Sequence, residues 1–219
     1  MDKLELLKRF EKLPTGNIAD AMRKLGVTCK TVIGLHPLNP EQKRGAGYAV
    51  TVQQMERSVD QEKAVLTKHG HVIDTMLGMG DLLVIDVGGK ETPCTGGALL
   101  AMRANMLGAA GFLVNGCLRD LGEIRKLGFP VYLKGGSPVK SSPQLETVGI
   151  NVPVEINGTQ IVPGDLIVMD ETGVVVVPPQ YAERVCQAAE EILTLEEQVE
   201  GFVRQGYGVE ESFDLAMKQ

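Results

Sequence analysis

The sequence predicts an α/β fold with two short helices ahead of its sheet and a long helix near its C-terminal end. The strongest signal lies in residues 82–118, where an apolar strand, a glycine-rich loop, a run of good helix formers and a second apolar strand follow one another. This order implies a right-handed crossover between parallel strands. The chain has 219 residues, which is enough for one large domain or two small ones.

Two helices are expected before the sheet. Apolar residues spaced three apart from Leu4 to Phe10 lie on one helical face. A second helix is expected over residues 18–25, capped by residues 15–17 and ended by Gly26.

The next elements are a strand and a helix. Residues 45–52 have the composition of a strand that begins with glycines, and residues 60–68 are expected to form a helix that Gly70 and His71 end. His69 and His71 have the spacing of a metal-binding pair. Their place directly after a helix instead favours solvent-facing turn residues.

Residues 94–120 form the unit around which the sheet is expected to be built. Two glycines open its helix, and Gly108 ends that helix as a C′ glycine. Residues 112–114 are the following buried strand, and Gly116 is expected to break it just before an Arg-Asp pair.

The crossover places the start of this helix and the end of the second strand at the same edge of the sheet. The free N–H groups around residues 97–100 therefore face the loop that carries Arg119 and Asp120. A helix start attracts anions, and a guanidinium pairs well with a carboxylate. Asp120 suits a hard cation such as Mg²⁺ or Mn²⁺. Together these groups predict a pocket for a 2-oxo acid chelated to a metal.

A simpler interpretation of the same residues stays open. Two glycines before a helix often form only a tight turn. An adjacent Arg-Asp pair in a loop is often a surface ion pair that contributes little to stability. The spacing does not decide between the two interpretations.

The C-terminal half contains more strands. Residues 80–86 resemble residues 164–170, which suggests two similar strands placed alike in one sheet or barrel. Asn157-Gly158 is a hairpin signal, and residues 174–177 predict a buried strand.

A long helix is expected over residues 180–205. Its apolar residues recur in steps of three and four, and its other face is rich in glutamate. Because a helix this long at a chain end usually packs beyond its own domain, we expect a homotrimer or hexamer in which it reaches a neighbour.

Composition excludes several function classes. The net charge is −6 with no basic run and aromatic residues make up 4% of the chain, so a nucleic-acid surface is not expected. No apolar stretch has the length of a membrane span and no signal peptide is recognised. The four cysteines are far apart, as in a cytoplasmic chain with reduced thiols. Cys117 beside the proposed site is expected to be a small buried residue rather than a nucleophile.

Taken together, these segments resemble one family over nearly the whole chain. The matching segments are residues 17–26, 45–52, 80–89, 96–101, 108–120, 127–131 and 163–178. They are similar to the RraA-like family, which includes the 4-hydroxy-4-methyl-2-oxoglutarate aldolases and regulators of ribonuclease E. The resemblance implies a single domain over residues 1–219 with a β/β/α sandwich fold of the swivelling-domain type. It also implies trimers or pairs of trimers with active sites between subunits.

The resemblance assigns roles to particular residues. It implies that Arg119 binds substrate as the catalytic arginine and that Asp120 binds the metal. A glutamate of the neighbouring subunit's C-terminal helix approaches the metal through water in the aldolases, and Glu197 matches it best, with Glu196 close behind. The residues that bind the pyruvoyl group at the helix start fall on Gly97, Ala98, Leu99 and Leu100.

Two positions depart from the aldolase pattern. Ala98 stands where the aldolases have an acidic residue, and Asn115 replaces an aspartate at the strand end. A carboxylate that would orient metal waters or move a proton is therefore missing. The ability to bind the metal and the substrate carboxylate is therefore expected with more reason than the aldolase activity.

The expected function is that of a class II, divalent-metal-dependent lyase. It would decarboxylate oxaloacetate, cleave 4-hydroxy-2-oxo acids to pyruvate, or do both. One alternative is a regulator without catalytic activity that inhibits ribonuclease E-type enzymes by protein contact. Another is an S-adenosylmethionine methyltransferase, because residues 84–89 faintly resemble that cofactor's first motif. The natural substrate, the preferred metal and the choice between trimer and hexamer stay open.

Overall fold

The computed structural model describes residues 2–42, 44–57, 68–141 and 144–218 of the chain. Its strands run over β1 (Lys30–Val32), β2 (His36–Pro37), β3 (Gly45–Glu56), β4 (Asp81–Asp86), β5 (Gly111–Leu118), β6 (Val131–Gly136), β7 (Leu145–Ile150), β8 (Val154–Ile156), β9 (Thr159–Ile161), β10 (Leu166–Asp170) and β11 (Gly173–Val177). In the main sheet the order is β1-β11-β10-β3-β4-β5-β6-β2, and β7 also pairs with β3. The strands β8 and β9 form a separate hairpin.

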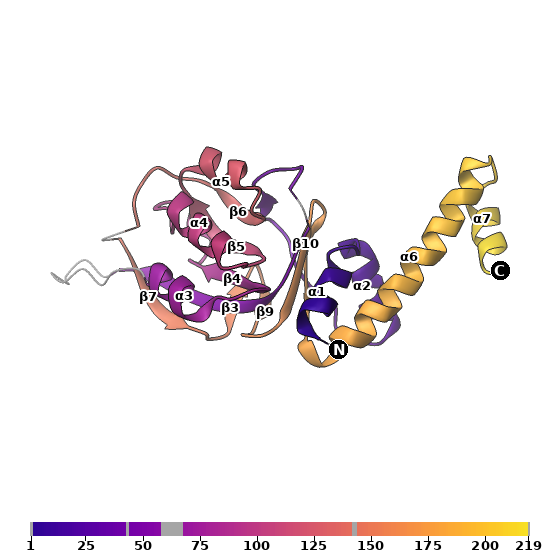
Figure 1. The fold of residues 1–219 in the computed structure, drawn as a ribbon, viewed down its shortest axis with the longest axis horizontal. Helices are drawn as coiled ribbons and strands as arrows, with labels where there is room; N and C mark the ends of the chain where they lie inside the picture. Colours follow the sequence, from indigo (N-terminus) through magenta and orange to yellow (C-terminus); the bar gives the residue numbers. More distant parts are fainter. Residues whose placement is uncertain (1, 43, 58–67, 142–143, 219) are drawn as a thin grey trace.

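The helices lie on two sides of this sheet (Figure 1). They are α1 (Lys3–Phe10), α2 (Thr15–Lys24), α3 (His69–Met76), α4 (Ala98–Met106), α5 (Leu121–Leu127), α6 (Ala182–Arg204) and α7 (Val209–Ala216). Figure 1 shows α3, α4 and α5 on one side and α1, α2 and α6 on the other, with α6 projecting away from the sheet. The expected α/β fold with a long C-terminal helix is confirmed, and α7 is an addition that the sequence pattern did not indicate.

Three apolar cores explain the layers. The first lies between α3, α4 and α5 and one face of strands β3 to β6, and includes Ile73, Ala104 and Ile85. The second encloses the opposite face of β4 and β5 under β10, β11 and the β8–β9 hairpin. The third joins α1, α2 and α6 to the outer face of β10 and β11. β5 and β10 are buried along their whole length, and because both of their faces are covered, their sequences are mostly apolar rather than alternating.

The crossover at the centre of the fold agrees with the sequence prediction. β4 and β5 are parallel neighbours, and α4 connects them. One detail was wrong: Gly116 does not break β5, which continues to Leu118 with a register shift between Val114 and Cys117. A Cβ on Gly116 would lie 2.3 Å from a methyl carbon of Val87, so the glycine permits close packing there.

The start of α2 also differs from the prediction. The helix begins at Thr15 with Pro14 before it, so residues 15–17 do not form a separate cap. Thr15 instead donates two hydrogen bonds to the buried carboxylate of Asp170, from its N–H at 2.8 Å and its hydroxyl at 2.7 Å. These bonds tie α2 to the end of β10. The predicted end at Gly26 is confirmed by its positive φ of 68°.

The histidines after β3 require a correction. The helix expected over residues 60–68 falls largely on residues 60–67, which lie outside the described ranges. The helix α3 begins at His69, so Gly70 and His71 lie within a helix rather than ending one. His71 is exposed as expected, but His69 is buried at 1% exposure and is not a solvent-facing turn residue.

The two similar segments occupy related places. They form β4 and β10, which lie on either side of β3 in the same sheet. β4 runs parallel to β3 and β10 runs antiparallel, so the likeness covers local sequence and position but not direction. The hairpin predicted at Asn157-Gly158 joins β8 and β9, with φ values of 49° and 82° at its two turn residues.

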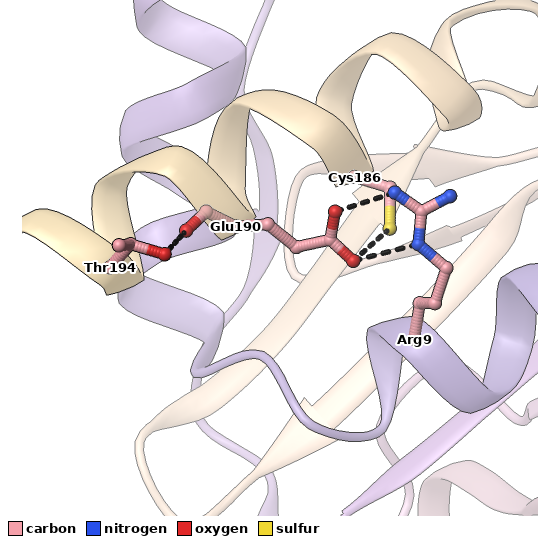
Figure 2. A network of polar contacts seen from close by, with 4 residues as sticks. All are labelled: Arg9, Cys186, Glu190 and Thr194. Carbon is pink, nitrogen blue, oxygen red and sulfur yellow. Dashed lines mark hydrogen bonds and ion pairs between the residues drawn. The ribbon is translucent and has the colours of Figure 1, made fainter.

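One ion pair fastens the long helix to the first helix. Arg9 donates from Nε to Oε1 of Glu190 at 2.7 Å and from Nη2 to Oε2 at 2.5 Å (Figure 2). The Sγ of Cys186, one turn earlier on α6, lies 3.9 Å from the same carboxylate. The hydrogen bonds from Arg9 lower the pKa of Glu190 below its ordinary value. Within the described ranges, no helix combines the length and apolar character needed to span a membrane.

Candidate active site

The loop before α4 lies beside the end of β5. The N–H of Thr95 donates to the carbonyl oxygen of Cys117 at 2.8 Å, and the N–H of Arg119 donates to that of Gly96 at 2.9 Å. Gly96 and Leu118 form a parallel bridge. The helix start and the Arg-Asp loop therefore meet at one edge of the sheet, as the crossover geometry predicts.

Gly97 is where the two segments come closest. A Cβ at this position would lie 2.7 Å from Oδ2 of Asp120 and 2.9 Å from Cγ of Arg119. Any larger residue would push the Arg-Asp loop away from the start of α4. The absence of a side chain at Gly97 thus permits the arginine and the aspartate to lie against the helix N-terminus.

Arg119 and Asp120 form an open pair. The Nε of Arg119 is 3.4 Å from Oδ2 of Asp120, and the two side chains are 44% and 46% exposed. Asp120 stands immediately before α5 with a left-handed φ of 56°, a conformation that is costly for a residue other than glycine. Its carboxylate makes no capping hydrogen bond to α5. Both side chains thus keep polar atoms available to a ligand.

The first turn of α4 adds donors to the same place. The N–H of Leu100, which was expected to be free, instead donates to the carbonyl oxygen of Gly97 at 3.1 Å, because the first turn of the helix closes there. Within the described residues, the N–H groups of Gly97, Ala98 and Leu99 have no backbone acceptor, as expected for a helix start. The Leu99 side chain is 78% exposed, whereas Leu100 packs against the core beneath the helix.

A shallow pocket of about 350 Å³ accompanies the pair. It is lined by residues 118–121, by Gly136 at the end of β6 and by Ser137 and Pro138 just after it, whereas the predicted substrate-binding residues 97–100 are not among its lining residues. These residues at and after the end of β6 were not predicted as site residues. Their signal was the Gly-Gly-Ser-Pro run at the carboxyl end of a strand parallel to β5. Two larger hollows, of about 830 and 890 Å³, border the N-terminal helices and contain neither Arg119 nor Asp120.

Asp120 is the carboxylate among the residues that line this pocket. The described residues contain no cluster of three or more His, Cys, Asp or Glu side chains that could hold an ion. A single exposed carboxylate suits Mg²⁺ or Mn²⁺, which keep several waters and take further oxygens from a substrate. The donor chemistry therefore fits such a hydrated cation and does not fit a closed all-protein metal cage.

Glu197 lies elsewhere in the chain. It is exposed on α6, and α6 projects past α1 and α2 away from α4 and α5 (Figure 1). Its neighbour Glu196 accepts a hydrogen bond from Nδ2 of Asn17 at 2.6 Å, so that carboxylate is engaged with α2. Within one chain the structure does not bring Glu197 to Asp120, and a contribution across subunits stays a prediction.

Three further residues that the sequence singled out are buried or partly buried near the site. Asn115 is buried, donates to Oδ1 of Asp86 at 2.8 Å and does not line the pocket beside Arg119. Its difference from the aldolases thus lies outside the pocket lining. Cys117 is buried, and its burial raises the pKa of the thiol, in agreement with the prediction of a small buried residue. Ala98, the other departure, is the first residue of α4 and packs on the core.

The glycines that suggested a methyltransferase lie in an extended loop. Gly88 and Gly89 follow β4 with positive φ values of 66° and 73°. No helix begins until Ala98, and the intervening loop is held by β5. The S-adenosylmethionine motif needs a helix directly after its glycines, so this loop lacks the required context.

Fold and site thus define an α/β protein in which a helix N-terminus, an arginine and an aspartate converge beside the carboxyl end of a parallel strand. The model of the RraA-like family, described as Aldolase/RraA, matches residues 15–176. The chain belongs to this family.

Three known proteins are similar to this chain in sequence or in fold. A protein of Halalkalibacterium halodurans, named provisionally as a 4-hydroxy-4-methyl-2-oxoglutarate aldolase, is 34% identical over 192 residues, which are 85% of this chain and 83% of that protein. An uncharacterized protein from Pseudomonas syringae shares the fold with a TM-score of 0.82 and 25% identity, covering 95% and 96% of the two chains. Streptomyces coelicolor RraAS2 has a TM-score of 0.78 and 29% identity over 93% and 97%, and is described as an unusual member of the RNase ES inhibitor RraA protein family.

Proposed function

We propose that this protein is a divalent-metal-dependent lyase of 2-oxo acids that releases pyruvate. The observation that carries the proposal is the close approach at Gly97, where the side chains of Arg119 and Asp120 lie against the residue that precedes α4. The family includes a relative named for cleavage of a 4-hydroxy-2-oxo acid, which points to the same substrate class.

Each group has a role in this proposal. Arg119 forms paired hydrogen bonds with the substrate carboxylate, and the N–H groups of Ala98 and Leu99 hold a second oxygen. Asp120 holds Mg²⁺ or Mn²⁺, which when bound withdraws electrons from the keto group as a Lewis acid. Arg119 also stabilises the negative charge that builds up on the pyruvate enolate when the C–C bond breaks.

Decarboxylation is expected to exceed aldol cleavage. Loss of CO₂ from oxaloacetate needs no base to begin, whereas retro-aldol cleavage requires removal of a hydroxyl proton. Ala98 provides no carboxylate for that step. The proposal therefore assigns oxaloacetate decarboxylation as the stronger activity and cleavage of 4-hydroxy-4-methyl-2-oxoglutarate as the weaker one.

The first prediction tests Asp120. Pyruvate release from oxaloacetate should rise with Mg²⁺ or Mn²⁺ and fall with EDTA, and Asp120→Asn should lower the metal-dependent rate ~100-fold or more. The melting temperature should change little because the side chain makes no capping bond. Asp20→Asn, which removes an exposed carboxylate from α2, is the matched control. Unchanged Mg²⁺ stimulation in Asp120→Asn would contradict the assignment.

The second prediction concerns assembly. We propose a homotrimer or hexamer in which α6 carries Glu197 to the Asp120 of a neighbouring chain. The projection of α6 and the exposed apolar side chains of Val203 on α6 and Phe213 on α7 support this arrangement.

Subunit mixing tests it directly. Asp120→Asn and Glu197→Gln should each be weak alone, and co-expression should restore part of the activity because some sites then combine both intact residues. Glu191→Gln, another exposed glutamate of α6, is the control and should retain activity. A fully active monomer by light scattering at micromolar concentration would contradict the arrangement.

A second candidate function has support from one relative. The likeness to RraAS2, which is described within an RNase inhibitor family, favours a protein that inhibits a ribonuclease E-type enzyme by contact. Adding the wild-type chain and Arg119→Lys to a ribonuclease E cleavage assay separates the two candidates. Equal inhibition by both, together with no pyruvate release by the wild type, would favour the regulator.

A further inference from the structure

Three buried polar side chains meet beneath the loop that leads to α4. His69 comes from the start of α3, Gln54 from β3 and Thr95 from the loop itself, and their exposures are 1%, 2% and 1%. The Nε2 of His69 lies 2.7 Å from Oγ1 of Thr95, and the Thr95 hydroxyl donates to Oε1 of Gln54. Because buried polar groups in proteins are usually hydrogen-bonded, these three side chains must be held together by bonds of this kind.

With the Gln54 amide oriented so that its Oε1 faces Thr95, the hydrogen bonds specify which tautomer His69 adopts. The Thr95 hydroxyl has one proton and gives it to Gln54, so it accepts its second bond from Nε2–H of His69. His69 is then the neutral tautomer with a bare Nδ1, and that atom has no partner within the described chain. Burial lowers the pKa of His69 to about 4, which agrees with a neutral ring.

Thr95 connects the buried cluster to the candidate site. Its hydroxyl is held by His69 and Gln54, and its N–H is held by the carbonyl of Cys117 at 2.8 Å. The next residue, Gly96, accepts the N–H of Arg119, and α4 begins two residues later. Thr95 is therefore held at both its side chain and its backbone, and it directly precedes Gly96 and the start of α4. A shift of Thr95 would move both the first amides of α4 and the backbone of Arg119.

We propose that His69 is a positioning residue that, through Thr95, sets the alignment between the first amides of α4 and Arg119 and thereby the affinity of the pocket for a carboxylate. This inference rests on the proposed function, because it names what fixes the anion-binding half of that site. Asp120 belongs to the turn between β5 and α5, so the metal-binding half should not depend on His69.

A merely structural role makes a different prediction. If the cluster only stabilises the core, its loss should lower the melting temperature without a selective effect on carboxylate binding. If it positions the loop, carboxylate binding should weaken while binding of the metal alone does not. The distinguishing measurement is thus the ratio of two affinities in one variant.

Four variants of the cluster and one control variant provide that measurement. His69→Leu removes the donor and Thr95→Val removes the hydroxyl while retaining the shape. His69→Gln and Thr95→Ser keep a donor or a hydroxyl at the same place, and His71→Leu changes an exposed residue of the same helix as the control. Thr95→Val keeps the test possible if His69→Leu does not fold.

Binding of Mn²⁺ alone and of oxalate in the presence of Mn²⁺ would be measured by calorimetry, with kcat and KM for oxaloacetate. We expect His69→Leu and Thr95→Val to weaken oxalate binding and raise KM by ~10-fold or more, with Mn²⁺ affinity within about twofold of wild type. His69→Gln, Thr95→Ser and His71→Leu should stay near wild type. Unchanged oxalate affinity in both disrupting variants, or an equal loss of Mn²⁺ affinity, would overturn the proposal.

Amide hydrogen exchange provides a readout that needs no ligand. The N–H groups of Thr95 and Arg119 should exchange faster in His69→Leu than in wild type, while amides of β10 should not change. Nitrogen NMR should show His69 as the Nε2–H tautomer. If the wild-type protein binds no oxalate with Mn²⁺, the proposed function fails, and the exchange rates still decide whether His69 holds the loop.

Discussion

Two arginine–carboxylate pairs in this molecule differ in how completely they satisfy each other. Arg9 and Glu190 form a two-bond pair, at 2.7 and 2.5 Å, that joins helices distant in sequence. Arg119 and Asp120 are adjacent in sequence, their Nε and Oδ2 atoms are 3.4 Å apart, and both side chains are nearly half exposed. The same residue types therefore form a closed structural pair in one place and an open pair in the other.

The difference shows what a binding pair requires. In the closed pair each group uses the other as its partner, and the hydrogen bonds from Arg9 lower the pKa of Glu190. In the open pair the left-handed backbone of Asp120 and the absence of a side chain at Gly97 hold both groups beside the helix amides. Stability follows from mutual satisfaction, whereas binding needs polar groups that are positioned and still available.

The largest effect in this comparison is expected at the open pair. Arg119→Lys keeps the charge but loses the planar fork, so kcat/KM for oxaloacetate should fall ~100-fold, which corresponds to about 2.7 kcal/mol. The melting temperature should stay close to wild type because the side chain is 44% exposed. The matched change at the closed pair, Arg9→Lys, should leave kcat/KM unchanged. Similar kinetics for both variants would remove the distinction between the pairs.

A smaller effect is expected at the closed pair. Glu190→Gln should lower the free energy of unfolding by about 1 kcal/mol at pH 7, because the pair is partly exposed and solvent screens it. Turnover should not change. Denaturant unfolding measures the difference, and Glu191→Gln, in a more exposed pair of the same helix, is the stability control.

This effect also has a defined pH dependence. Since the pKa of Glu190 is lowered in the folded protein from its ordinary 4.5, the ionised pair stabilises the fold above that value. The stabilisation is lost as the pH falls through the lowered pKa. The gap between wild type and Glu190→Gln should therefore shrink below about pH 4. A gap that grows in acid would contradict the assignment of the pair.

The smallest effect is expected from a change beside the open pair. Ala98→Asp adds a carboxylate at the start of α4, where the helix dipole favours it. Cleavage of 4-hydroxy-4-methyl-2-oxoglutarate should rise by several-fold relative to oxaloacetate decarboxylation, because a proton acceptor is then present. Ala98 packs on the core, so the melting temperature is a necessary control, and Ala98→Asn separates the charge from the added size. Wild-type cleavage that already exceeds decarboxylation would show that another group acts as the base.

Some of this organisation could be predicted because it depends on local pattern and chain direction. The apolar runs, the glycine-opened helix and the parallel crossover are properties of contiguous residues, and they predict that Gly97 lies near Arg119 and Asp120. The prediction at Gly116 was wrong because a glycine usually weakens a strand, whereas here it allows β5 to pass close to Val87.

Other features depend on residues that are far apart in the chain. Thr15 has the chemistry of a helix cap, but its bonds go to Asp170 because α2 packs on the end of β10. His69 looked like a turn residue, yet it contacts Thr95 across α3 and the loop before α4. No local pattern contains these partners, since each lies tens of residues away.

The sequence alone therefore determined the α/β class, the crossover and the adjacency of an arginine and an aspartate beyond a strand end. Those properties follow from short-range periodicity and from the direction that parallel strands impose. The tertiary structure decided which of the two arginine–carboxylate pairs is closed, which histidine is buried and what holds the start of α4. These outcomes depend on packing between distant segments, because burial and hydrogen-bond partners exist only after the layers have assembled.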